Sequence, residues 1–106
     1  MQHRSASTRY RIIDRCLRDK RNPYPTLDYL IDACSAALGK DSDVGRSTIQ
    51  HDIQDLRSGR AIPGKRAPIE YSKLEKGYYY YDPHFSLDSL QLEQDEWNSL
   101  RYAVAE

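Results

Sequence analysis

One stretch decides the fold of this 106-residue chain, and it reads Val44-Gly45-Arg46-Ser47-Thr48-Ile49-Gln50-His51-Asp52-Ile53-Gln54-Asp55-Leu56-Arg57. Its apolar residues Ile49, Ile53 and Leu56 recur at helical spacing. We therefore predict a helix over residues 46–58, with these three side chains forming a buried row.

The side of this helix opposite the buried row is polar but carries little charge. It holds Ser47, His51, Gln54 and Ser58, with Gln50 at its edge. An ordinary solvated helix face would favour Lys and Glu, whereas hydroxyls, amides and an imidazole can both donate and accept hydrogen bonds. Asp52 flanks the buried row and is expected to pair with a neighbouring arginine.

Two further helices are predicted before this one. Apolar residues on one stripe indicate a helix over residues 8–19, with Asp14 and the nearby arginines on its polar side. Pro23 and Pro25 then break the helical pattern. Thr26 is a plausible N-cap for a second helix, which Gly39 ends in the usual C-terminal position.

After residue 59 the pattern becomes extended. Residues 69–71 and 78–81 are predicted to form two strands, joined by a loop over 72–77 whose Gly77 can adopt a positive φ. Alternation would direct Tyr78 and Tyr80 toward the helices. Outward tyrosines have two other interpretations, namely a hydrogen bond to phosphate and stacking on single-stranded bases.

A last helix is expected over residues 93–105, with Trp97, Leu100 and Val104 on one stripe. This stripe can close the core, form a dimer contact or join a further domain. Because the chain stops inside this helical pattern, we expect a longer protein. Residues 1–82 are then one domain, and residues 83–106 are a linker and the start of a C-terminal helix.

The predicted fold is mainly α with a small β-hairpin. Three helices followed by a hairpin is the order of a winged helix-turn-helix, in which the third helix enters the DNA major groove and the hairpin lies along the backbone. A major-groove reader needs hydrogen-bonding side chains. We predict base contacts from Arg46, Ser47, Gln50, His51 and Gln54. Phosphate or wing contacts are predicted for Thr26, Thr48, Arg57, Lys73 and Lys76.

Composition narrows the function classes. The formal net charge is zero, yet residues 1–22 carry seven basic and two acidic side chains, whereas residues 82–106 carry six acidic side chains and one arginine. Such asymmetry favours a polyanion partner. No run of about 18 apolar residues or apolar signal core is present, which indicates a cytoplasmic protein.

Chemistry other than binding has little support in the sequence. Cys16 and Cys34 lack CxxC spacing and lie on apolar stripes, so we expect reduced core thiols. Histidines and carboxylates show no ligand spacing, and no nucleophile–base pair or Gly-rich phosphate loop is evident. We expect no metal, no cofactor and no enzymatic activity.

The stretch over residues 44–57 also resembles the third-helix pattern of winged-helix regulators that carry a C-terminal WYL domain, within the broader DeoR-like group. Residues 9–14, 68–71 and 76–80 resemble the same family's first helix and wing, so the resemblance covers roughly residues 9–105. It implies a bacterial transcriptional regulator, usually dimeric, whose C-terminal domain senses an effector ligand. This chain departs from the pattern at Gly45, where a capping serine is usual, and at Ser47 and His51, where arginines are common.

An alternative function remains open, in which the winged helix is a protein–protein interaction or dimerisation module without DNA binding. It is favoured by the zero net charge, by Asp55 on the outer side of the third predicted helix, and by the apolar stripe of the last helix. Retention on immobilised duplex DNA at low salt separates the two functions.

Overall fold

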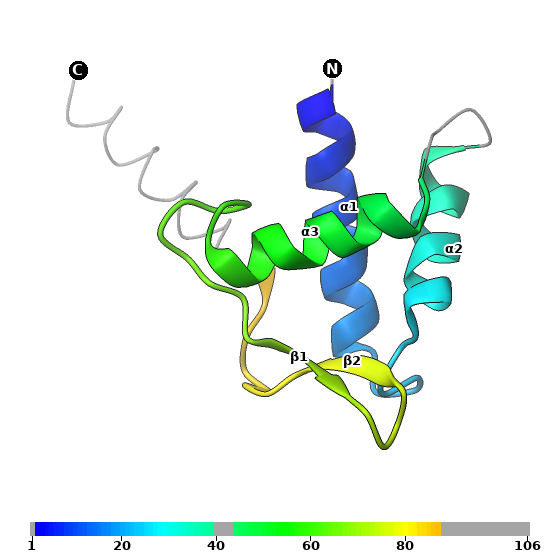
Figure 1. Cartoon of the computed structure of the whole chain (residues 1–106), viewed down its shortest axis with the longest axis vertical. Helices are drawn as coiled ribbons and strands as arrows, with labels where there is room; N and C mark the ends of the chain where they lie inside the picture. Colours follow the sequence, from blue (N-terminus) through cyan, green and yellow to red (C-terminus); the bar gives the residue numbers. More distant parts are fainter. Residues whose placement is uncertain (1, 40–43, 88–106) are drawn as a thin grey trace, which may run out of the picture.

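The computed structural model describes residues 2–39 and 44–87. In chain order its elements are α1 (Gln2–Arg18), α2 (Leu27–Leu38), α3 (Arg46–Ser58), β1 (Ile69–Ser72) and β2 (Gly77–Tyr80). In Figure 1, α3 crosses in front of α1, α2 lies beside α1, and the hairpin of β1 and β2 lies below the helices. Three helices and a two-stranded antiparallel hairpin confirm the predicted fold class.

Helix α1 begins earlier than predicted. The apolar stripe suggested a start near Thr8, but the helix begins at Gln2. Residues 2–7 contain no proline or glycine, so nothing in them stops a helix that the apolar stripe further along has already established. At the other end, Arg15 and Arg18 occupy the last turn, where positive side chains interact favourably with the helix dipole.

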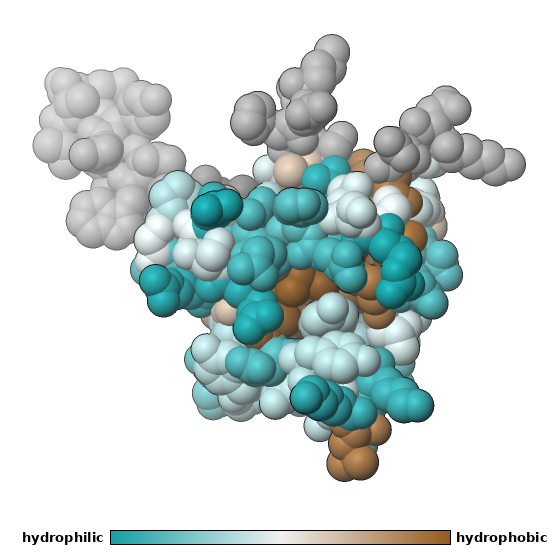
Figure 2. Space-filling model, in the orientation of Figure 1, coloured by the Kyte–Doolittle hydropathy of each residue, from teal (hydrophilic) through white to brown (hydrophobic). Residues whose placement is uncertain are grey.

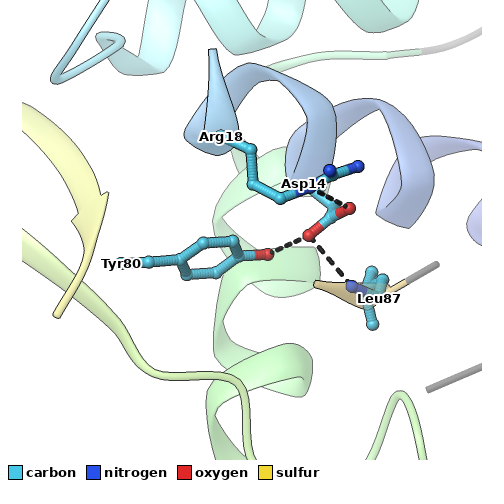
Figure 3. Close-up of polar contacts among 4 residues, drawn as sticks. All are labelled: Asp14, Arg18, Tyr80 and Leu87. Atoms are coloured by element: carbon cyan, nitrogen blue, oxygen red, sulfur yellow. Dashed lines mark hydrogen bonds and ion pairs between the residues drawn. The ribbon is translucent and has the colours of Figure 1, made fainter. Parts of the chain in front are cut away.

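The sequence placed Asp14 on the polar side of α1 but did not predict its burial. This residue is 0% exposed. Its carboxylate accepts hydrogen bonds from the Tyr80 hydroxyl at 2.7 Å, from the Leu87 backbone N–H at 3.1 Å and from Arg18 Nε at 2.9 Å (Figure 3). The periodicity of α1 gave no sign of this burial, because the covering residues come from β2 and from the segment after it.

Helix α2 has the predicted ends. The Thr26 hydroxyl accepts a hydrogen bond from the Tyr29 backbone N–H at 3.1 Å, which caps the first turn. Gly39 follows the last turn with φ 93°, a conformation that side chains rarely adopt, and its N–H bonds to the Ser35 carbonyl. The proline-containing segment between α1 and α2 is non-helical, as predicted.

The hairpin is confirmed apart from the ends of its strands. Its register pairs Ile69 with Tyr80 and Tyr71 with Tyr78. Tyr78 and Tyr80 pack against the core, as the alternation predicted. The Tyr71 and Tyr78 rings meet edge to face, with centroids 5.0 Å apart. One face of the sheet is therefore fixed to the helices, which a two-stranded hairpin needs for stability.

The predicted role of Gly77 was wrong. The left-handed residue of the turn is Lys76, with φ 59°, and Gly77 is not among the glycines with positive φ. Gly77 is instead buried against the segment before α2, where a Cβ atom would lie 1.9 Å from the Tyr24 carbonyl oxygen. The next residue, Tyr78, donates its backbone N–H to the Pro25 carbonyl at 2.9 Å. A glycine is thus required here by close approach, not by its φ angle.

The core lies where the three helices meet the hairpin. Its buried apolar residues are Ile13, Leu30, Cys34, Ile49, Ile53, Leu56, Ala67, Ile69 and Leu87. Both cysteines are free thiols, and burial raises the pKa of Cys34 to about 12. None of the helices in the described ranges is long and apolar enough to span a bilayer. The helix predicted over residues 93–105 lies outside the described residues.

Candidate functional site

The outer face of α3 is an exposed polar surface. Ile49, Ile53 and Leu56 are buried, which confirms the predicted row. The opposite face is exposed at Arg46, Ser47, Gln50, His51, Gln54, Arg57 and Ser58. Figure 2 shows this face as a hydrophilic band over α3. The segment therefore presents its hydroxyl, amide and imidazole groups to solvent, where a partner can reach them.

A partly buried ion pair joins α3 to α1. Arg9 of α1 donates to Asp52 of α3 through two hydrogen bonds, from Nε to Oδ2 at 2.5 Å and from Nη2 to Oδ1 at 3.1 Å. The Asp52 side chain is only 5% exposed, and these bonds raise the pKa of Arg9. The predicted pairing of Asp52 with an arginine is confirmed, with a partner that is close in space and remote in sequence. Two parallel bonds also restrict rotation of α3 about its axis.

The two ends of α3 differ in their capping hydrogen bonds. Gly45 is its N-cap residue and supplies no side-chain hydrogen bond, so the departure from a capping serine leaves the first turn without that support. At the other end Gly59 adopts a left-handed conformation, and its N–H bonds to the Asp55 carbonyl.

Arg46, the first residue of α3, forms an ion pair at the surface. Its Nη1 donates to Asp28 Oδ1 of α2 at 3.1 Å. The arginine side chain is 65% exposed and the aspartate side chain 79% exposed. The pair therefore bridges the starts of α2 and α3 at the surface of the molecule.

An open cleft of about 350 Å³ lies between the starts of α2 and α3 and the hairpin. Figure 2 shows apolar surface in the gap between the hydrophilic band over α3 and the hairpin. The residues that line the cleft are Thr26, Leu27, Asp28, Arg46, Gln50, Tyr71, Lys76 and Tyr78. Four predicted site residues from three different elements thus meet here, namely Thr26, Arg46, Gln50 and Lys76.

The other predicted site residues lie outside this cleft. Ser47, His51, Gln54 and Arg57 are exposed along α3, and Lys73 is exposed in the hairpin turn. Thr48 is half-buried in the first turn of α3.

The hairpin turn projects away from the core (Figure 1). Lys73, Glu75 and Lys76 are exposed there, and Leu74 is 89% exposed. The turn is closed by a hydrogen bond of 2.7 Å from the Lys76 N–H to the Ser72 carbonyl and by one of 3.1 Å from the Glu75 N–H to the Ser72 hydroxyl. The two lysines are thus carried by a well-bonded turn.

Four residues that line the cleft were not among the predicted site residues, namely Leu27, Asp28, Tyr71 and Tyr78. The sequence assigned Asp28 no functional role, and it placed Tyr71 only in the first predicted strand. The pairing of Tyr71 with Tyr78 follows from the hairpin register, so counting back from the turn would have found it. Tyr78 was expected to pack on the helices; it does so and also lines the cleft, and burial raises its pKa.

A metal centre finds no support in residues 2–39 and 44–87, where no group of three or more His, Cys, Asp or Glu side chains is arranged to hold an ion. Exposed donors and acceptors on α3, an adjoining cleft and a basic hairpin turn therefore make up the candidate site. This arrangement suits binding.

The family whose sequence model matches the chain is described as the N-terminal winged helix domain of WYL domain-containing proteins, and the match covers residues 5–82. The chain belongs to this family. Comparison with curated proteins and with solved structures found no match.

The matched segment contains α2, α3, both strands and the cleft that these elements line. In this WYL-type winged helix domain, the hairpin over residues 69–80 is the wing, and we use that name below. The domain has the exposed third helix and projecting wing that the resemblance implied.

Proposed function

We propose that this domain binds double-stranded DNA in a sequence-specific manner, as part of a transcriptional regulator. The third helix, α3, would enter the major groove, and the wing would lie along the backbone. The observation that carries the proposal is the outward, hydrogen-bonding face of α3, held in place by the Arg9–Asp52 pair. Membership of the WYL winged helix family supports it.

Base recognition is assigned to Arg46, Ser47, Gln50, His51 and Gln54. Each base pair presents a different set of donors and acceptors in the major groove, and these side chains match them chemically. A glutamine amide pairs with adenine through two hydrogen bonds, and an imidazole N–H donates to a guanine edge. All five side chains belong to exposed residues of one helix.

Backbone contacts are assigned to residues around the base-reading face. Lys73 and Lys76 are exposed in the wing turn, and Arg57 is exposed near the end of α3. The Thr26 hydroxyl accepts its capping bond through oxygen, so its proton can still be donated to a phosphate. Thr48 takes part to a smaller extent, because it is half-buried.

The proposal extends to the whole protein. Residues 1–82 act as the DNA-binding domain, and residues 83–106 lead toward an effector-binding domain of the WYL type. A homodimer in a bacterial cytoplasm would place two such domains on a roughly palindromic site, with half-sites about one helical turn apart. The domain works without catalysis and without a cofactor.

Replacing Gln50 or His51 by alanine is expected to relax base preference at one position of the site. A good hydrogen-bonded pair discriminates against the wrong base by about 1–3 kcal/mol, and alanine removes that term. Selection of bound duplexes from a randomised pool measures the preference. Arg15→Ala is the control, because Arg15 is exposed on α1, which lies behind α3 (Figure 1).

Replacing Lys76 by alanine is expected to weaken binding to all duplexes alike. One lost phosphate contact also reduces the slope of log K against log salt by about 0.9. Fluorescence titration at several salt concentrations measures both quantities. Arg15→Ala removes the same charge from α1, which is assigned no contact with DNA, and should leave the slope unchanged. Unchanged affinity and preference in the Gln50, His51 and Lys76 variants would argue against α3 and the wing as the DNA-binding surface.

A second candidate is a protein-interaction module, and the exposed apolar residues favour it. Leu74 is 89%, Tyr71 47% and Tyr29 44% exposed. Exposed apolar side chains of this kind can bury their surface against a protein partner or a second copy of the chain. The two candidates separate on immobilised duplex DNA at low salt. A chain that is not retained, but migrates as a stable dimer, supports the interaction module.

A further inference from the structure

The ion pair between Asp28 and Arg46 leaves part of the arginine fork unused. Asp28 engages Nη1 alone, and the Arg46 guanidinium has no other hydrogen-bond partner within residues 2–39 and 44–87. A guanidinium donates through two edges, one formed by Nη1 and Nη2 and the other by Nε and Nη2. The Nε–Nη2 edge is therefore available to a partner.

The position of this edge matters because Arg46 is the first residue of α3. In helix-turn-helix proteins the N-terminal residues of the groove-entering helix contact base edges. A guanidinium edge pairs with guanine O6 and N7 through two hydrogen bonds, and it does so best when its orientation is already fixed. A long arginine side chain that is 65% exposed loses much rotamer freedom on binding unless something orients it beforehand.

Asp28 also carries the wrong charge for a surface that meets phosphates. It lines the same cleft as Lys76 and Gln50 and is 79% exposed. An isolated carboxylate there would repel DNA, whereas a carboxylate paired with Arg46 is neutralised. Its hydrogen bond to Arg46 therefore makes a carboxylate at this position compatible with a DNA-binding surface.

We propose that Asp28 of α2 is a positioning residue that orients Arg46 and thereby sets a preference for guanine at one position of the DNA site. This inference rests on the proposed DNA binding and goes beyond it. It locates one determinant of base preference in the second helix, outside the helix that reads the bases. Asp28 itself makes no contact with a base.

The chain provides a matched control in Asp32, which lies one turn further along α2. Asp32 is exposed, and its carboxylate has no hydrogen bond or ion pair among the described residues. Asp28→Asn and Asp32→Asn both remove one negative charge from the same helix. Both should therefore raise affinity for an unrelated duplex slightly. Only Asp28→Asn should change base preference.

The experiment is selection from a randomised duplex pool by the 106-residue chain and four variants. They are Asp28→Asn, Asp32→Asn, Arg46→Lys and the double variant Asp28→Asn/Arg46→Lys. Lysine retains the charge of arginine but lacks the fork. We expect Arg46→Lys to weaken guanine preference at one position and Asp28→Asn to weaken it at the same position by about fivefold, the upper range for an exposed ion pair. In the Arg46→Lys background, Asp28→Asn should change nothing further, because its effect passes through the fork.

The outcomes separate this inference from the proposed function. If the unaltered chain enriches no sequence from the pool, sequence-specific DNA binding fails and the inference fails with it. If the chain enriches a sequence but Asp28→Asn matches Asp32→Asn in base preference, only the inference is overturned. The inference alone is also overturned if Asp28→Asn lowers guanine preference by the same factor in the Arg46→Lys variant as in the unaltered chain. Thermal unfolding midpoints show that the compared variants are folded.

Discussion

Replacing Asp14 by alanine is expected to destabilise the domain by about 2–4 kcal/mol, because a buried donor that loses its acceptor costs about 1–3 kcal/mol. The Asp14 carboxylate is 0% exposed and accepts from three groups in different parts of the chain. The variant removes the acceptor of the buried Leu87 N–H and an acceptor of the Tyr80 hydroxyl. Its smaller side chain also leaves a cavity beneath β2.

Urea unfolding of the variant and the unaltered chain measures this loss. Asp14→Asn should lower the free energy of unfolding by less than Asp14→Ala, because the amide oxygen still accepts a hydrogen bond. A smaller loss should remain, because the charge that attracts Arg18 is gone. Asp32→Asn is the control for removing an exposed carboxylate and should stay within about 0.5 kcal/mol of the unaltered chain. Equal midpoints for Asp14→Ala and Asp32→Asn would show that the buried carboxylate does not hold these elements together.

Replacing Gly77 by alanine is expected to destabilise the domain by about 3 kcal/mol, at the upper end for overpacking a close contact. The added Cβ would lie 1.9 Å from the Tyr24 carbonyl oxygen and 2.9 Å from the Pro25 carbonyl oxygen. Both are backbone atoms, so a side-chain rotation cannot relieve the clash. The wing must move away from the segment before α2, which breaks the Tyr78–Pro25 hydrogen bond.

Gly45→Ala is the matched control, because no atom lies within 4 Å of a Cβ at position 45 and its φ is −130°. Alanine is a poorer N-cap residue than glycine, so Gly45→Ala should cost about 1 kcal/mol at most, well below the cost of Gly77→Ala. For Gly77→Ala we expect a second effect, a fall in DNA affinity, because displacement of the wing carries Lys76 with it. A Gly77→Ala variant as stable as Gly45→Ala would contradict the close approach between the wing and Tyr24.

The parts of the fold that the sequence predicted correctly are those with local signals. Helix α2 has a capping threonine, an apolar stripe and a terminal glycine close together in sequence. The hairpin follows from two extended runs around a short polar turn. Burial of Asp14 and the close approach at Gly77 depend on segments that meet only after folding. The early start of α1 was missed because its first residues carry no apolar stripe.

The candidate site divides in the same way. Exposure of Ser47, Gln50 and His51 follows from helical periodicity around the buried row, so the sequence was enough to predict it. The pairing of Arg46 with Asp28 joins two helices and has no signature within either. The cleft likewise needs the packed arrangement of α2, α3 and the wing. Residue types therefore predicted the chemistry of the surface, but not how its members are oriented.

The Arg9–Asp52 pair has a consequence for how this surface can evolve. It anchors α3 through a residue on the inner side of the helix, together with Ile49 and Ile53. The outer residues Ser47, His51 and Gln54 thus have no share in holding the helix in place. They can be exchanged for other side chains while the scaffold keeps its stability, so new binding preferences can arise one substitution at a time.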